Sequence, residues 1–267
     1  MIIDFHTHVF SDKIAQRTIE LLSEKGGVPA FSDGTVKGLL SRMEEAGVDV
    51  GITLPVLTKP TQFESVNRFA AEINQEFASK ERRLISFAGI HPDCEDIDGK
   101  MRFIADNGFV GVKIHPDYQD TYINDERYVR ILEAAAEYDL TVVTHAGIDV
   151  GYTEVHCPPA LALEVIRRVP RARMILAHFG GHGMHDAVLN LLCGENVYLD
   201  TAYDLRFIGE EAFQKILARH GEDRLLFASD SPWSDIKRDV EIFNSFCISD
   251  SAREKILCTN AKKLLRI

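Results

Sequence analysis

Short, continuously apolar runs recur along this chain from one end to the other. We predict a strand from each run, at residues 2–8, 48–54, 84–90, 109–115, 140–145, 174–178, 197–201 and 225–230. The runs are apolar throughout and do not alternate with polar residues, which is typical of parallel strands that are buried on both faces.

The segments between these runs follow a helical period. Ala162, Val165, Ile166 and Val169, for example, fall on one face of a helix. Strands that alternate with helices predict βαβ units and a parallel sheet. Eight such units in 267 residues fit an α/β fold of the (β/α)8 TIM-barrel type, with residues 1–267 as one domain.

One connection, residues 11–34, is longer than a barrel of this kind needs. It contains two consecutive glycines and a proline near its end. We interpret it as a mobile loop over the site.

The composition limits the binding partners and the cellular compartment that we expect. A net charge of −11 opposes binding to nucleic acid or to an anionic membrane surface. The five cysteines form no Cys-x-x-Cys pair and are odd in number, which favours a reducing compartment. No apolar run approaches the roughly 20 residues of a membrane-spanning helix. We therefore expect a cytoplasmic protein with a small-molecule substrate.

Histidines stand at the ends of several apolar runs. His6 and His8 are two residues apart in the first predicted strand, so their side chains leave the same face. His145, His178 and Asp230 end three later runs. The C-terminal ends of the strands share one face of a TIM barrel, where the active site lies. Because imidazoles and carboxylates bind zinc and similar ions, we predict a metal held by His6, His8, His145 and Asp230, with His178 beside it.

Seven short motifs stand in order along almost the whole chain. They are Asp-Phe-His-Thr-His at 4–8, Gly-Val-Lys-Ile-His-Pro at 111–116, Thr-His-Ala-Gly at 144–147, Ala-His-Phe-Gly-Gly at 177–181, Tyr-Leu-Asp-Thr at 198–201, Ala-Ser-Asp-Ser-Pro at 228–232 and Thr-Asn-Ala-Lys-Lys-Leu-Leu at 259–265. This set resembles the amidohydrolase-2 branch of the metal-dependent amidohydrolase superfamily. The resemblance implies a (β/α)8 barrel with a divalent metal, and the same five site residues.

The number and identity of the ions depend on the fourth predicted strand. We expect one divalent ion, with Zn²⁺ as the first choice and Mn²⁺ as an alternative. Two-metal members of the superfamily often bridge their ions with a carboxylated lysine or a glutamate on this strand, which here carries Lys113 and no glutamate. A second ion at Lys113 therefore stays open. In the other interpretation, Lys113 lies lower in the barrel beside an acid and His115 faces the substrate.

Further candidates for substrate contact follow the predicted strands. We predict substrate contacts for Lys113 and His115, and also for His91 and Tyr152. The alternative role of His91 is in a structural turn. Tyr152 and His182 lie in loops after the fifth and sixth predicted strands, where residues either contact a substrate or are solvated. Asp200 also ends a strand, and we expect it to be structural.

The predicted site supports a hydrolase first. A divalent ion activates a water molecule at neutral pH, so that small amides, esters or lactones are cleaved. In this mechanism Asp230 accepts the proton of the water, and His178 stabilises the developing oxyanion.

Two other functions stay open. A metal-dependent non-oxidative decarboxylase or hydratase of a small carboxylated compound would use the same site, with Asp230 moving a proton to carbon. A barrel that binds without catalysis is opposed by the five retained site positions. A phosphatase barrel of the type that also opens with Asp-x-His-x-His would need more metal ligands and basic residues. The sequence leaves the substrate open, and with it the oligomeric state, a homo-oligomer included.

Overall fold

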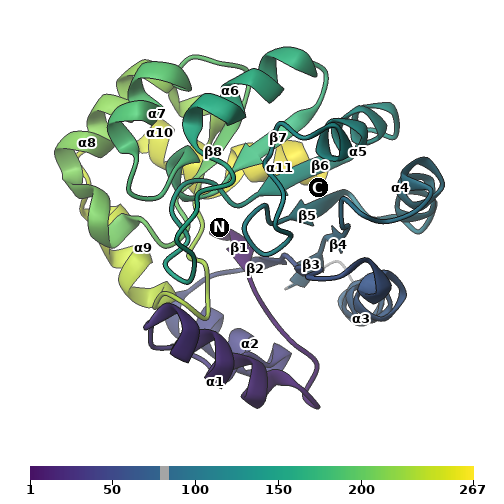
Figure 1. The fold of residues 1–267 in the computed structure, drawn as a ribbon. Coiled ribbons are helices and arrows are strands. Elements are labelled where there is room, and N and C mark those ends of the chain that lie inside the picture. Colours follow the sequence, from purple (N-terminus) through teal and green to yellow (C-terminus); the bar gives the residue numbers. More distant parts are fainter. Residues whose placement is uncertain (79–83) are drawn as a thin grey trace.

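The computed structural model describes residues 1–78 and 84–267. Short parallel strands surround a central axis, and helices cover them from outside (Figure 1). The strands are β1 (Ile3–Thr7), β2 (Val50–Thr53), β3 (Leu84–Ser86), β4 (Ala88–Gly89), β5 (Gly111–Ile114), β6 (Thr141–Thr144), β7 (Arg173–Leu176), β8 (Tyr198–Asp200) and β9 (Leu225–Leu226).

Helices follow every strand except β3, which leads directly into β4. They are α1 (Ala15–Gly26), α2 (Val36–Ala46), α3 (Phe63–Glu76), α4 (Ile97–Asp106), α5 (Glu126–Glu137), α6 (Pro159–Arg168), α7 (His185–Leu191), α8 (Leu205–His220), α9 (Ile236–Ser245), α10 (Asp250–Glu254) and α11 (Asn260–Leu265). A π-helical turn, Lys255–Thr259, joins α10 to α11. None of the helices in the described part of the chain is both long and apolar enough to cross a membrane.

The strands form two parallel sheets, in the orders β1-β2-β3 and β4-β5-β6-β7-β8-β9. Main-chain hydrogen bonds join β1 to the segment that begins with β9: Phe5 N donates to Phe227 O at 2.9 Å, and Asp230 N donates to His6 O at 2.8 Å. The first and last strands are therefore neighbours, as the predicted TIM-barrel class requires, and that prediction of the fold class is confirmed.

The predicted strand 84–90 is divided into β3 and β4 at Phe87, where the two sheets meet. Two asparagines of α3 bind the main chain on either side of this break. Asn74 pairs with the N–H and C=O of Ser86 at 2.7 and 2.9 Å, and Asn67 pairs with those of Gly89 at 2.7 and 3.0 Å. Side-chain amides thus satisfy backbone groups that a neighbouring strand would otherwise bind.

Several other strands end earlier than predicted, because the chain turns at the site. His178 and Asp230 have φ angles of 59° and 70°, in the left-handed region that a strand excludes. His178 begins a short 3-10 turn, His178–Gly180, one residue beyond the end of β7. These two side chains therefore project from turns beyond the strand ends.

Residues 11–34 contain α1, so the prediction that they form a loop is wrong, but they do lie over the site, because Ile14, Leu22 and Val28 line the cavity described below. Gly27, with φ of 63°, ends the helix as its C-cap. The glycine pair thus terminates a helix, and Figure 1 shows α1 beside α2 at one side of the barrel.

We predict that Asn67→Ala lowers the free energy of unfolding by about 2–4 kcal/mol, because it leaves the N–H and C=O of Gly89 without partners in the interior. Urea unfolding monitored by circular dichroism measures the change. Asn244→Ala, at an exposed position of α9, is the matched control and should change stability by no more than about 0.5 kcal/mol. Equal effects of the two substitutions would contradict this account of the break.

Candidate metal centre and active site

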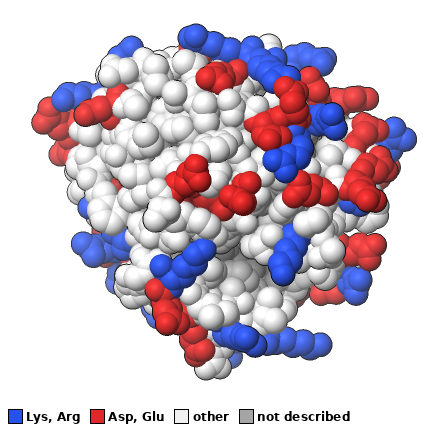
Figure 2. All heavy atoms as spheres, viewed as in Figure 1, with Lys and Arg blue, Asp and Glu red and all other residues white. Residues whose placement is uncertain are grey.

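A cavity of about 440 Å³ opens at the C-terminal ends of the strands. One end is polar and includes His6, His8, Lys113 and Asp230. Apolar side chains form much of the remaining wall: Val9, Phe10, Ile14, Leu22, Val28, Leu54, Val56, Val66, Phe69, Ile148, Val150 and Trp233. Many charged side chains lie toward the margin of this face, and Asp or Glu side chains also lie near its middle (Figure 2).

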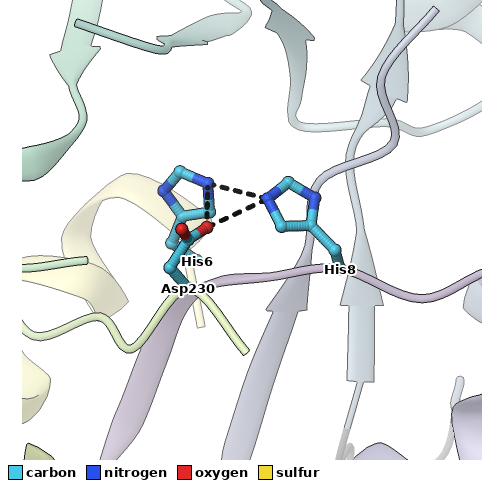
Figure 3. A group of neighbouring side chains, drawn as sticks. All are labelled: His6, His8 and Asp230. Carbon is cyan, nitrogen blue, oxygen red and sulfur yellow. Dashed lines mark hydrogen bonds and ion pairs between the residues drawn. The ribbon is translucent and has the colours of Figure 1, made fainter. Parts of the chain in front are cut away.

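His6, His8 and Asp230 converge at the polar end (Figure 3). The two Nε2 atoms lie 3.1 Å apart. Asp230 Oδ1 lies 3.3 Å from His6 Nε2 and 3.1 Å from His8 Nε2. The two histidines come from β1 and the residue after it, and Asp230 from the turn beyond β9, so the seam of the barrel assembles the group.

Hydrogen bonds on the far side of each ring fix which nitrogen faces this group. His6 Nδ1 donates to Asp200 Oδ2 at 3.0 Å, and His8 Nδ1 donates to Leu54 O at 2.8 Å. When both rings are neutral, their Nε2 atoms present lone pairs to each other and to a carboxylate oxygen, an arrangement that needs a positive charge. Burial, followed by the nearby charge of Lys113, lowers the pKa of His6 well below its ordinary value, which keeps the ring neutral. Neutral imidazoles and a carboxylate fit a divalent ion.

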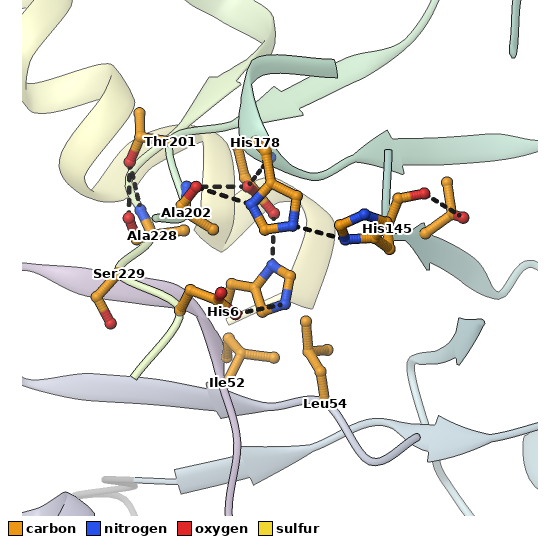
Figure 4. A network of polar contacts seen from close by, with 12 residues as sticks. His6, Ile52, Leu54, His145, His178, Thr201, Ala202, Ala228 and Ser229 are labelled. Carbon is orange, nitrogen blue, oxygen red and sulfur yellow. Dashed lines mark hydrogen bonds and ion pairs between the residues drawn. The ribbon is translucent and has the colours of Figure 1, made fainter. Parts of the chain in front are cut away.

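His145 and His178 lie beside this group as a second pair (Figure 4). His145 Nδ1 and His178 Nε2 are 2.9 Å apart, and His178 Nδ1 donates to Ala202 O at 2.9 Å. Within the described residues, the buried Nε2 of His145 has no hydrogen-bond partner, and Asp117 Oδ2 lies 3.7 Å from it. Three of the four predicted metal ligands thus form one tight group, and the fourth, His145, pairs with His178.

Lys113 lies at the base of the site, fully buried. Its Nζ is 3.1 Å from His6 Nε2, and burial lowers its pKa, while the charges of Asp200 and Asp230 act in the opposite direction. Lys113 thus supplies positive charge beside two carboxylates. This placement matches the interpretation that puts Lys113 low in the barrel beside an acid.

Asp200 does more than the structural role expected of it. Besides His6, it accepts hydrogen bonds from the main-chain N–H groups of His178 and Ala202, both at 3.0 Å. One carboxylate therefore orients a predicted metal ligand and the turn that carries His178.

His115 forms another wall of the cavity. Its ring stacks on His145 and on Tyr118, with centroids 4.4 and 4.0 Å away, and its Nε2 lies 3.5 Å from Asp149 Oδ2. Burial raises the pKa of Asp149 to about 6. His115, His145 and Asp149 also make a second group with metal-ligand spacing.

The remaining substrate-contact candidates lie at different distances from the cavity. Tyr152 is not among its lining residues, and its ring carries the Lys25 ammonium at 3.5 Å. His91 does not line it either: its Nδ1 accepts from Asp93 N at 3.1 Å, as in the structural-turn alternative. His182 does line the cavity.

Three acids near the site, Asp117, Asp149 and Asp204, were not predicted from the sequence. They follow the strand-ending residues His115, His145 and Asp200 by two to four positions. Acidic residues in the loops just after the strands were the available signal, because these loops form the functional face of a TIM barrel.

Comparison with known families agrees with this architecture. The family model described as amidohydrolase matches residues 3–267, so the chain belongs to the amidohydrolase family. Comparison with curated proteins gives no match.

Several solved structures are similar over nearly the whole chain. An uncharacterised TIM-barrel protein from Bordetella bronchiseptica is 17% identical, with a TM-score of 0.77 and coverage of 99% of this chain and 98% of that one. A dihydroxybenzoic acid decarboxylase from Polaromonas sp. JS666, with bound manganese and the inhibitor 2-nitroresorcinol, is 17% identical, with a TM-score of 0.73 and coverage of 99% and 96%. The 5-carboxyvanillate decarboxylase from Sphingomonas paucimobilis is 17% identical, with a TM-score of 0.70 and coverage of 100% and 99%.

We predict that Asp200→Asn weakens binding of Mn²⁺ or Zn²⁺ by about 10–100-fold, since it removes the carboxylate that orients His6. Titration calorimetry on metal-stripped protein measures the affinity. His220→Gln is the control, because His220 is buried outside the cavity on Val197 O. Unchanged affinity in Asp200→Asn would return Asp200 to a structural role.

Proposed function

We propose that this protein is a metal-dependent, non-oxidative decarboxylase of a small carboxylic acid. The observation that carries the proposal is a cluster of neutral imidazoles and a carboxylate at the end of a cavity with largely apolar walls. Decarboxylases among the similar structures add support. This reaction thereby replaces hydrolysis, the first choice of the sequence analysis.

The apolar wall favours loss of carbon dioxide over addition of water. A carboxylate that enters such a cavity loses its hydration, which costs free energy. Neutral carbon dioxide has no such cost, so its formation is favoured there. A bound divalent ion, held by His6, His8 and Asp230, would supply positive charge for the oxygen atoms of the substrate. Mn²⁺, which one similar structure contains, and Zn²⁺ are both compatible with this donor set.

Asp230 is the residue we assign to proton transfer. It lines the cavity and accompanies His6 and His8 at its polar end. Its Oδ1 faces His6 and His8, and we assign the proton to its other oxygen, Oδ2, which gives it to the substrate carbon that bears the carboxylate. The bond between that carbon and the carboxylate then breaks, its electron pair stays with the carbon, and carbon dioxide leaves. Asp230 regains a proton from solvent.

We assign His178 to the negative charge that develops on the substrate. Its ring lines the cavity and is fixed by Ala202 O on one side and His145 on the other. Once Nε2 takes up a proton and turns its hydrogen bond from His145 Nδ1 to the substrate, it can donate to a substrate oxygen.

The reaction is tested by incubating protein loaded with Mn²⁺ or Zn²⁺ with small aromatic carboxylic acids, 2,6-dihydroxybenzoate among them, and measuring released carbon dioxide. A parallel set of amides, esters and lactones tests hydrolysis. Hydrolysis in the second set, with no carbon dioxide from the first, would contradict the proposal.

We predict that Asp230→Asn lowers kcat by at least about 10³-fold, near the upper part of what proton transfer contributes. Metal content, measured by elemental analysis, separates loss of the proton donor from loss of the ion. A metal-loaded variant with near-wild-type rates would show that another residue carries the proton.

His178→Asn should lower kcat by about 10²-fold while metal content stays near that of the wild type, because the ring stabilises charge without joining the tight ligand group. Loss of the ion in this variant would make His178 a ligand. Unchanged turnover would exclude a catalytic role.

A further inference from the structure

A buried carboxylate, Asp204, holds two histidines above the barrel. His182 Nδ1 lies 2.6 Å from Asp204 Oδ1, and His185 Nε2 lies 2.8 Å from Asp204 Oδ2. The Asp204 side chain is fully buried. Burial opposes its ionisation, but the hydrogen bonds from both imidazoles outweigh this effect, and the pKa of Asp204 lies below its ordinary value. Asp204 is therefore an anion that accepts from both rings.

The two histidines differ in their access to substrate. His182 lines the cavity, whereas His185 and Asp204 do not. Because His182 Nδ1–H is bound to Asp204, the neutral ring carries its lone pair on Nε2. Among the described residues no group hydrogen-bonds this nitrogen, and the His182 side chain is 16% exposed.

The main chain of His182 is fixed on both sides. Its N–H donates to Ala146 O, and its C=O accepts from Ile148 N, both at 3.0 Å. Gly147, between these two residues, has φ of 85°, and a Cβ there would collide with the main chain of His182. The loops after β6 and β7 are thus locked together around His182.

Aromatic rings hold the side chain from another direction. Tyr203 and Phe207 pack edge-on against the ring, with centroids 5.2 and 5.5 Å away. The Arg206 guanidinium lies over both of these rings, at 4.2 and 4.8 Å, and so braces them. His182 is therefore an ordered acceptor whose position is set by the fold before any ligand enters.

We propose that His182 Nε2 is a specificity-determining acceptor for a hydroxyl group of the substrate, and that Asp204 is its positioning residue. The inference rests on the proposed function, which places a carboxylate at the polar end of the same cavity. It adds a requirement to the substrate class: a second polar substituent, with an O–H to donate, on the side of the molecule that faces the loops after β7 and β8.

The physical basis is the cost of an unpaired acceptor. A ligand that fills the cavity without a hydroxyl at this point displaces the water at Nε2 and leaves this nitrogen without a hydrogen-bond donor. A ligand with the hydroxyl restores the hydrogen bond. A site that hydrogen-bonds a substrate hydroxyl strongly rejects analogues that lack this hydroxyl. An apolar site rejects analogues that carry an additional hydroxyl much less strongly.

The test uses two probes that differ by one hydroxyl, 2-nitroresorcinol and 2-nitrophenol, titrated calorimetrically into Mn²⁺-loaded full-length protein. The wild type should bind 2-nitroresorcinol at least about tenfold more tightly. His182→Phe should bring this ratio to within about threefold of one, mainly by weakening 2-nitroresorcinol. Its affinity for 2-nitrophenol should stay near the wild-type value, which also shows that the variant is folded. Should the phenylalanine variant fail to take up metal, His182→Leu is measured in the same way.

His185→Phe is the matched control, because it removes the other imidazole from Asp204 and leaves the cavity wall intact. It should retain most of the preference. A preference that persists in both His182 variants, or a wild type with no preference, including one that binds neither probe, overturns the inference. Carbon dioxide release from 2,6-dihydroxybenzoate is scored separately: if it is absent while the preference depends on His182, the proposed reaction fails and the acceptor role of His182 stands.

Discussion

The hydrogen bond between His6 Nδ1 and Asp200 Oδ2 joins β1 to β8 through the centre of the barrel. It holds the proton of His6 on the far side of the ring and turns the Nε2 lone pair toward His8 and Asp230. The same carboxylate binds the main chain at His178. A single buried acid thereby couples both halves of the site, and the rest of the centre depends on where it is held.

The buried charges at the base of the cavity need compensating charges nearby. Asp200 and Asp230 are carboxylates in a region with little solvent, and an unpaired charge there is costly. The Lys113 ammonium compensates part of this charge. The Nε2 lone pairs of His6 and His8 face each other and can both bind a further cation. The electrostatics of the site therefore favour a bound metal.

Strand alternation and the histidines at strand ends were enough to predict the barrel class. They were also enough to predict which residues of the first and last strands meet. The division of residues 84–90 at Phe87 was hidden, because it depends on Asn67 and Asn74 of a helix that precedes it in sequence. Periodicity carries no signal for a side chain that replaces a strand partner.

The finer geometry of the site was also beyond the sequence. Whether His145 faces the metal group or His178 depends on the rotamer of His145 and on Asp117, which lies beside its Nε2. The roles of Asp200 and Asp204 come from contacts with β1 and with the loop after β7, at long separations in the chain. Asp200 is the last residue of β8, and Asp204 lies in the connection that follows it, where positions follow no repeating pattern.

Anomalous diffraction from crystals of the Mn²⁺- or Zn²⁺-loaded protein tests the central claim most directly. We expect an anomalous peak bonded to His6 Nε2, His8 Nε2 and a carboxylate oxygen of Asp230, with His8 Nδ1 still bound to Leu54 O. A peak confined to His115, His145 and Asp149, or no peak at the ends of β1 and β9 in metal-replete crystals, would contradict it.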